Sequence, residues 1–285
     1  MQHNRGYLII AQDSQNIDYH RMAYALALSI KNSQSSVNQV CLATDRDIKT
    51  LPKTYKVFDK IVNIPWGDHA ADAKWKINNK WKYYYMTPFD ETVILDADML
   101  FTSDISDWWD TLSQKNIFAT SSPITYRGEV IVDNSYRKTF TNNELPNVHT
   151  AFMYFKKNET AAELFKLVET IFNNWELFFY EFLDETRPKF LSGDVAYALA
   201  MKILGIENEC ISNHSVPSFV HMKSKLQNIP HEYITDDWTL HIPTSYTKDG
   251  ALKVGNYQQY LPFHYQIKEW LTDDILKKLE ERYFQ

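Results

Sequence analysis

Asp96 and Asp98 lie one residue apart and follow directly on the apolar run Val93-Ile94-Leu95. Such a run is typical of a strand covered on both faces, and ligands of open α/β sheets bind at the carboxyl ends of strands. Two carboxylates in that place can share a hard divalent cation, which would neutralise charge on a diphosphate. Because the same spacing also occurs in solvated turns, Asp96-Ala97-Asp98 is interpreted together with its surroundings.

The sequence contains neither of two common glycine-rich phosphate-binding motifs. The chain has 7 glycines among 285 residues, and it contains neither G-x-G-x-x-G nor G-x-x-x-x-G-K. A nucleotide ligand would therefore need another anchor for its phosphates. The net charge of −6 and the pI of about 5.9 argue against a dedicated nucleic-acid binder, which normally presents a basic face. This charge balance does not exclude modified DNA as an occasional substrate.

The cysteines and the N-terminal segment bear on the compartment. Cys41 and Cys210 are the only cysteines and lie far apart in apolar settings, so we expect two buried free thiols, as suits a reducing cytoplasm. No signal peptide is visible, and no apolar run approaches the ~18 residues of a membrane span. We therefore expect a cytoplasmic protein without a transmembrane segment.

The elements that must position the aspartates alternate between strands and helices. In the first 120 residues, strands are expected at 7–11, 40–43, 61–64 and 92–95, and helices at 22–30, with Asp18 as N-cap, and 75–85. In the remainder, strands are expected at 117–120 and 151–155, and helices at 160–180, 194–204 and 271–283, the last with Thr272 in its capping signal. This alternation predicts one α/β domain whose Rossmann-like, mostly parallel sheet is flanked by helices, with a C-terminal elaboration.

The surroundings of Asp96 resemble the glycogenin-like retaining glycosyltransferases of the GT-A fold, sugar-transferase family eight. In that family a lysine and an aromatic-rich helix precede a V-F-x-D-A-D strand, and x-L-V-x-x-N-I-D-D-L-F follows it. The matching segments here are Lys80-Trp81-Lys82-Tyr83-Tyr84-Tyr85, Val93 to Phe101, and Asp104-Ile105-Ser106-Asp107-Trp108. Lys80 lies sixteen residues before Asp96, which is the spacing of the family's donor-binding lysine.

Three further segments resemble later motifs of the same family. His149 to Tyr154 is similar to its N-S-G-V-x-V strand, with histidine in place of asparagine, which leaves the sugar contacts there open. Gly193-Asp194-Val195 is similar to its G-D-Q, whose aspartate lies beside the donor sugar; Asp194 would also suit a helix N-cap. The late H-F-x-G-x-x-K-P-W is matched by His264 to Trp270, which contains Lys268. His221, with Lys223 and Lys225 nearby, is an alternative to His264.

The resemblance implies one GT-A-type catalytic domain over residues 1–285, with a nucleotide-sugar-binding half at 1–120 and an acceptor half at 121–285. It implies a hexosyltransferase that moves a hexose from a nucleoside diphosphate sugar, in the first place a UDP-sugar, to a hydroxyl acceptor with retention. Asp96, Asp98 and His264, or alternatively His221, would hold Mn²⁺ or Mg²⁺. Lys80 and Lys268 would stabilise the departing diphosphate.

Roles for the remaining site residues follow from the same resemblance. The end of the first strand, Ala11-Gln12-Asp13, would contact the base and ribose of the donor, with Tyr19 as a stacking ring and Asp45 nearby. Asp194 would stabilise an oxocarbenium-like state or act as nucleophile. An inverting enzyme would instead need a carboxylate base near the acceptor, for which the candidates are Glu181, Asp184 and Asp236.

The nature of the acceptor and two competing functions stay open. A polysaccharide, a lipid-linked sugar, a protein or a modified DNA base could each supply the hydroxyl group. Aromatic faces suit sugar rings but also fill cores, and the residues in question are Trp66, Trp75, Trp81, Tyr83, Tyr84, Tyr85, Trp108, Trp109 and Trp238. A sugar nucleotidyltransferase would share a related fold but normally has a glycine-rich N-terminal loop. A catalytically degenerate glycan-binding protein is the non-enzymatic alternative.

Overall fold

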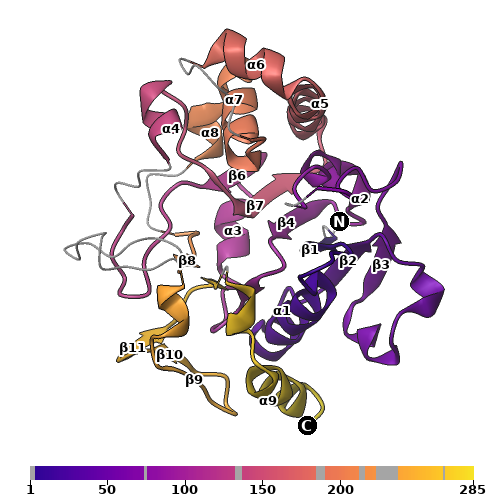
Figure 1. The fold of residues 1–285 in the computed structure, drawn as a ribbon, viewed down its shortest axis with the longest axis vertical. Coiled ribbons are helices and arrows are strands. Elements are labelled where there is room, and N and C mark those ends of the chain that lie inside the picture. The colour runs from indigo at the N-terminus through magenta and orange to yellow at the C-terminus, as the bar shows by residue number, and fades with distance from the viewer. Residues whose placement is uncertain are drawn as a thin grey trace.

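The computed structural model describes residues 4–73, 76–131, 137–183, 190–211, 216–222, 237–265 and 267–285. Its centre is a six-stranded sheet in the order β3-β2-β1-β4-β7-β6 (Figure 1). The strands are β1 (Arg5–Ala11), β2 (Val40–Thr44), β3 (Lys60–Asn63), β4 (Glu91–Leu95), β6 (Ile117–Thr120) and β7 (His149–Lys156). β7 alone among them runs opposite to its neighbours β4 and β6, so the predicted mostly parallel sheet is confirmed.

The antiparallel pairing of β7 with β4 positions the site. Leu95, the last residue of β4, pairs with Phe152, and the amide of Asp96 donates to the carbonyl of Ala151 at 3.0 Å. The amino end of β7, with His149 and Thr150, therefore lies at the same edge as the carboxyl end of β4. A parallel β7 would have put its carboxyl end there instead.

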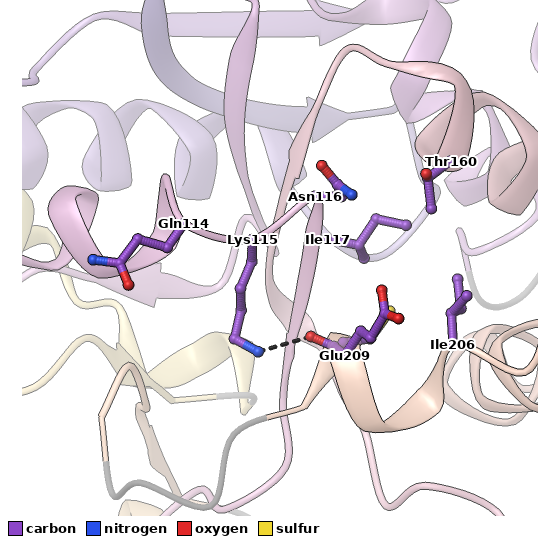
Figure 2. Close-up of a pocket in the computed structure, with 8 residues that line it drawn as sticks. Gln114, Lys115, Asn116, Ile117, Thr160, Ile206 and Glu209 are labelled. Carbon is purple, nitrogen blue, oxygen red and sulfur yellow. Dashed lines mark hydrogen bonds between the residues drawn. The ribbon is translucent and has the colours of Figure 1, made fainter.

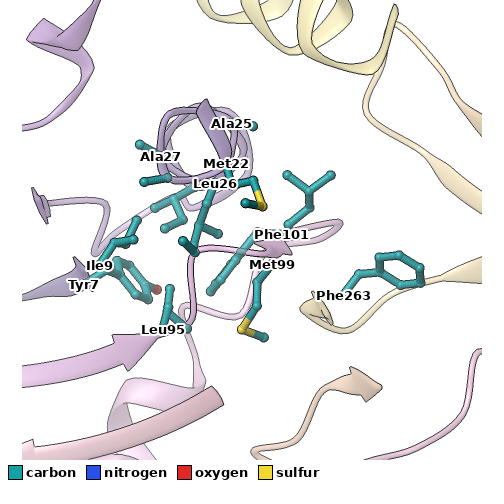
Figure 3. Close-up of a cluster of buried hydrophobic side chains, with 14 of the residues drawn as sticks. Tyr7, Ile9, Met22, Ala25, Leu26, Ala27, Leu95, Met99, Phe101 and Phe263 are labelled. Carbon is teal, nitrogen blue, oxygen red and sulfur yellow. The ribbon is translucent and has the colours of Figure 1, made fainter. Parts of the chain in front are cut away.

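Helices cover both faces of the sheet (Figure 1). The alternation of side chains along β1 assigns Tyr7 and Ile9 to one core and Leu8 and Ile10 to the other. Figure 3 shows the first core, in which residues of β1 and β4 meet α1 and the segment after Asp98. The helices of this core are α1 (Tyr19–Ser33), α3 (Trp108–Leu112) and α9 (Asp273–Tyr283). Those of the second core are α2 (Tyr83–Met86), α4 (Lys138–Asn142), α5 (Glu159–Asn173), α6 (Trp175–Phe182), α7 (Gly193–Leu204) and α8 (Glu207–Cys210).

Two small sheets form the C-terminal elaboration. The first has the order β5-β12-β8. In it, β12 lies between β5, which follows directly on Asp98, and β8, which is more than a hundred residues further along the chain. Its strands are β5 (Met99–Leu100), β8 (Val220–His221) and β12 (Phe263–His264). The second sheet consists of β9 (Thr244–Tyr246), β10 (Leu252–Val254) and β11 (Tyr257–Gln259). Short 3₁₀ helices lie at Ile48–Thr50, Lys53–Val57, Lys80–Lys82, Trp238–Leu240 and Lys268–Trp270.

Two helices differ from the prediction in extent. Instead of a helix over 75–85, the chain forms a 3₁₀ turn at Lys80–Lys82 and then the four-residue α2, with Trp75 outside the described residues. The predicted helix over 160–180 is interrupted at Asn174, which leaves the helical region at φ −130° and donates its side-chain amide to the carbonyl of Thr170. Asparagine favours such local bonds over continuing a helix, which explains the break.

Other expectations are confirmed. Asp18 accepts from the amide of Arg21 and Thr272 from that of Ile275, so both N-caps are present. Cys41 and Cys210 are buried free thiols. Within the described part of the chain, every helix is too short or too polar to cross a membrane.

Packing at Gly6 on β1 yields a stability prediction. A Cβ atom there would lie 2.5 Å from two ring atoms of the buried Phe89. We expect Gly6→Ala to lower the free energy of unfolding by about 1–3 kcal/mol, because a packed core resists added volume. Urea denaturation measures the change. In a Phe89→Leu background the added methyl group has more room, so the same substitution should cost less; an equal loss in both backgrounds would contradict the clash.

Candidate active site

Asp96, Asp98 and His264 converge at the carboxyl end of β4. Each offers a ligand atom, and the three atoms lie within 4.8 Å of one another. His264 reaches the group because β12 pairs with β5, and its Nε2 lies 3.2 Å from the carboxylate of Asp98. The two carboxylates provide hard oxygen ligands, which suit Mn²⁺ or Mg²⁺. Mn²⁺ also accepts the nitrogen of an imidazole. The buried Nδ1 of His264 has no hydrogen-bond partner among the described residues, so Asp98 is the polar partner of this ring, through Nε2.

Two lysines neutralise these carboxylates. Lys80 Nζ lies 2.7 Å from Asp96 Oδ1, and Lys268 Nζ contacts the carboxylate of Asp98. Burial works against the charge of Lys80, but Asp96 outweighs it and raises the pKa of the ammonium group. Burial likewise opposes the charge of Asp98, yet His264 and Lys268 hold the pKa of that carboxyl far below its usual value. Asp98 is therefore ionised at neutral pH, as a metal ligand must be.

Asp194 is held as a fixed anion beside this group. The amide and hydroxyl of Thr150 donate to its Oδ1 at 2.9 and 2.7 Å, and Arg137 donates to its Oδ2 at 2.6 Å. Although burial opposes ionisation, Arg137 and the two hydrogen bonds from Thr150 keep the pKa of Asp194 well below its usual value. With both oxygens engaged, Asp194 is better placed to stabilise positive charge than to attack as a nucleophile.

The predicted alternative role of Asp194 as a helix N-cap is wrong. Ser192 caps α7, and its hydroxyl accepts from the amide of Val195. Asp194 is the second residue of the helix, in the first turn, and its side chain points toward β7 instead. The adjacent Gly193 packs against Lys80, whose side chain would lie at an ordinary contact distance of 3.4 Å from an added Cβ atom.

Arg137 and Thr150 were not singled out from the sequence. Arg137 is 5% exposed, and it also bonds Asn147 and the carbonyl of Val148. It lies 57 residues from Asp194 in a stretch without clear periodicity, so no local pattern signals the pair. Thr150 follows His149 in the matched motif, but its role depends on the antiparallel direction of β7.

Three histidine rings line the site between β7, β8 and β12. The rings of His221 and His264 stack at 5.0 Å, and His149 lies 5.7 Å from His221. Burial, with Arg137 nearby, lowers the pKa of His149 to about 3, so this ring is neutral. His221 lies behind His264 on the neighbouring strand and is outside the three-residue group around Asp98. The geometry thus favours His264 over His221, while Lys223 and Lys225 lie outside the described residues.

The residues expected at the nucleoside lie at the end of β1. Gln12 donates to Asp68 at 2.6 Å, and the amide of Asp13 donates to Asp45 at 2.7 Å, just beyond the buried Ala11. Tyr19 begins α1; burial, reinforced by Asp98 and Asp96, raises the pKa of its phenol to about 12. Lys268 Nζ lies 5.7 Å from the centre of the Tyr19 ring, so Tyr19 lies beside the metal group.

A second group of possible metal ligands, Asp13, His20 and Asp45, lies beside Ala11. Arg46 already bonds Asp13 Oδ1 through two nitrogens at 2.7 and 2.6 Å. His20 Nδ1 faces Asp13 and its Nε2 faces Asp45, each at 3.7 Å, so the carboxylates lie on opposite sides of the ring. Thr44 Oγ1 lies 2.8 Å from His20 Nε2, whereas His20 Nδ1 and Asp45 Oδ1 have no hydrogen-bond partner among the described residues.

Several predicted residues lie away from the site. Glu181 is exposed near the end of α6, and Asp184 and Asp236 lie outside the described residues. Trp108 and Trp109 pack in the first core against Phe152 and Tyr7. A cavity of about 260 Å³ between β6, α5 and α8 shares no residue with the site, and Lys115 spans it to the carbonyl of Glu209 (Figure 2).

Comparisons with known proteins bear on the fold. No protein-family model and no curated protein matches the sequence. The apo form of mouse xyloside xylosyltransferase 1 aligns with a TM-score of 0.51 at 10% identity, over 92% of this chain and 98% of that chain. The glycosyltransferase GlyE of Streptococcus pneumoniae TIGR4 aligns with a TM-score of 0.49 at 13% identity, over 100% of this chain and 61% of that chain. Galactosyltransferase LgtC, in complex with donor and acceptor sugar analogs, aligns with a TM-score of 0.49 at 12% identity, over 98% and 95%.

The match to the xylosyltransferase spans nearly the whole of both chains and shows a shared fold. Together with the strand order of the central sheet, it confirms the predicted GT-A-type α/β architecture. This chain spans less than two thirds of the GlyE chains that it matches.

The Asp194 network predicts a pH-dependent stability. Because the pKa of Asp194 is lower in the folded than in the unfolded chain, its contribution is present above about pH 4 and is lost as the pH falls. We expect Asp194→Asn to lower the free energy of unfolding by about 2 kcal/mol at pH 7, and by progressively less below pH 4. Urea denaturation across pH 3–8 measures this, with the exposed Asp110→Asn as control. A loss that is independent of pH would contradict the ionised Asp194.

Proposed function

We propose that the protein is a metal-dependent glycosyltransferase that moves a hexose from a nucleoside diphosphate sugar, in the first place a UDP-sugar, to a hydroxyl acceptor. The observation that carries the proposal is the convergence of Asp96, Asp98 and His264 at the carboxyl end of β4, with Lys80 and Lys268 beside them. Carboxylates that can hold a divalent cation, with two ammonium groups beside them, suit the binding of a diphosphate. The resemblance to sugar-transferase family eight, through Lys80 and the Asp96-Ala97-Asp98 triplet, supports the same function.

Each residue of the site has a role in this reaction. A divalent cation bound by Asp96, Asp98 and His264 would act as a Lewis acid on the diphosphate oxygens. Lys80 and Lys268, which hold these carboxylates now, stabilise the negative charge that develops on the leaving nucleoside diphosphate. Gln12, Asp13 and Tyr19 contact the nucleoside. Residues 1–120 accordingly contribute most of the donor site, to which His264 and Lys268 are added from the acceptor half, 121–285.

The proposed stereochemical outcome is retention. Asp194 lies at the amino end of α7 between Thr150 and Arg137, and its ionised carboxylate stabilises an oxocarbenium-like sugar. Because both carboxylate oxygens are engaged, we favour this electrostatic role over a covalent intermediate. Glu181 is exposed on α6, outside the site, and is a poor candidate for the base that inversion requires.

One assay separates this proposal from its two alternatives. The protein is incubated with Mn²⁺ and a panel of nucleotide sugars, and in parallel with sugar phosphates and nucleoside triphosphates, and the released products are identified. Release of nucleoside diphosphate supports the transferase. Release of pyrophosphate from a sugar phosphate and a nucleoside triphosphate would indicate a sugar nucleotidyltransferase, and no reaction with any donor would indicate a degenerate glycan-binding protein.

The first prediction for this function concerns Asp98. We expect Asp98→Asn to reduce release of nucleoside diphosphate by about 100-fold or more and to abolish its dependence on Mn²⁺, because an amide is a weak ligand for a hard cation. The assay is run with and without Mn²⁺, and the exposed Asp110→Asn is the matched control. Unchanged activity in the Asp98 variant would exclude the metal assignment.

The second prediction concerns Lys80. Lys80→Met keeps the buried stem but removes the charge, so we expect UDP to bind about tenfold more weakly in the presence of Mn²⁺ while the fold persists. Isothermal titration calorimetry measures the affinity, and circular dichroism checks the fold. The exposed Lys253→Met on β10 should bind UDP as the wild type does. Equal affinity in all three proteins would remove Lys80 from the donor site.

A further inference from the structure

Of the aromatic residues singled out in the sequence, Trp66 is the most exposed in the described part of the chain. Trp81, Tyr83, Trp108 and Trp109 are buried at 8% exposure or less, Tyr85 is 43% exposed, and Trp66 is 62% exposed. An indole exposed to this extent leaves a large apolar face in water, which is unfavourable unless another molecule covers it.

The exposed ring is mounted on a rigid base. One face of Trp66 stacks on the buried Trp81 at 5.7 Å with an interplanar angle of 8°, and Tyr85 packs edge-on at 5.0 Å. His69, which is exposed, approaches the same Trp81 at 5.8 Å and adds polar ring nitrogens beside the stack. Because Trp81 covers one face, the exposed area of Trp66 is available for a flat ligand on the other.

The backbone holds Trp66 outward at a conformational cost. Trp66 has a φ of 58°, in the left-handed region that residues with a bulky side chain rarely adopt, and Gly67 follows at 81°. Lys82, which is fully buried, donates to the carbonyl of Gly67 at 2.5 Å and thereby holds this turn. Unfavourable conformations fixed in this way cluster at ligand sites.

The same turn is tied to the end of β1. Asp68, two residues after Trp66, accepts from Gln12 at 2.6 Å and also from Asn79, which precedes Lys80. Trp66 is thus held rigidly next to the donor-side edge of the sheet. It is nevertheless not part of the metal group or of the Asp194 network.

We propose that Trp66 is a carbohydrate-binding platform on which a pyranose ring of an oligosaccharide stacks. The C–H groups on one face of a pyranose match the apolar face of an indole, and its hydroxyl groups match a phenol such as Tyr85, which packs against Trp66 and is 43% exposed. A second copy of the chain or a nucleobase would also cover an indole. The exposed phenol of Tyr85, and the separate place proposed for the nucleoside at Gln12, Asp13 and Tyr19, favour the sugar.

The platform goes beyond the transfer reaction and is tested without donor or metal. Wild-type protein is applied to a printed array of defined oligosaccharides, and the best-bound oligosaccharide is then titrated by calorimetry. We expect Trp66→Ala to bind at least about tenfold more weakly and Trp66→Phe to recover part of the loss, since a phenyl ring keeps a stacking face. Tyr260→Ala, which removes an aromatic ring that is 63% exposed on another surface, should leave the affinity unchanged.

Three outcomes would overturn the proposal. The first is that the wild type binds no oligosaccharide, or binds it as the Trp66→Ala variant does. The second is that sedimentation shows a wild-type dimer and a Trp66→Ala monomer, which would assign the face to a second copy. The third is that Trp66→Ala weakens UDP binding but not oligosaccharide binding, which would assign the ring to a nucleobase. The test measures oligosaccharide binding and not transfer activity. The proposed platform and the proposed function can therefore fail independently of each other.

Discussion

Three carboxylates converge at one edge of the sheet, and the compensation of their charge is the constraint on which the site depends. Asp98 is almost fully buried, and Asp96 and Asp194 are partly buried. Left alone in low dielectric, such groups would repel one another and take up protons. Instead, Lys80 contacts Asp96, and Arg137 contacts Asp194. Asp98 is contacted by both Lys268 and His264. The three cations, Lys80, Arg137 and Lys268, come from three separate segments of the chain, so the carboxylates are compensated only when the whole domain is folded.

The topology explains how these segments meet. Parallel strands bring β1 and β4 to the same edge, and the reversed β7 adds Thr150 from its amino end. The small sheet β5-β12-β8 then returns the C-terminal part of the chain to Asp98, so that His264 and Lys268 arrive within a few residues of each other. The C-terminal elaboration is therefore part of the site.

Much of this arrangement could be predicted from local patterns. The strands of the first half, the caps Asp18 and Thr272 and the proximity of Lys80 to Asp96 follow from apolar runs, capping residues and motif spacing. The direction of β7 could not be predicted, because its apolar run has no polarity of its own. Arg137 was missed for a related reason, since its partner is distant in sequence and only tertiary structure joins them. The break at Asn174 reflects a side-chain bond that outweighed helical periodicity.

The contact between Lys268 and Asp98 has a consequence for the order of binding events. A cation that takes Oδ2 of Asp98 as a ligand displaces the ammonium group of Lys268, and that group then needs another anion. A diphosphate supplies one. On the proposed function, ion and donor are therefore thermodynamically linked: each raises the affinity of the other by the same factor, and neither saturates readily alone. Without the donor, the ammonium group of Lys268 competes with a free cation for Asp98.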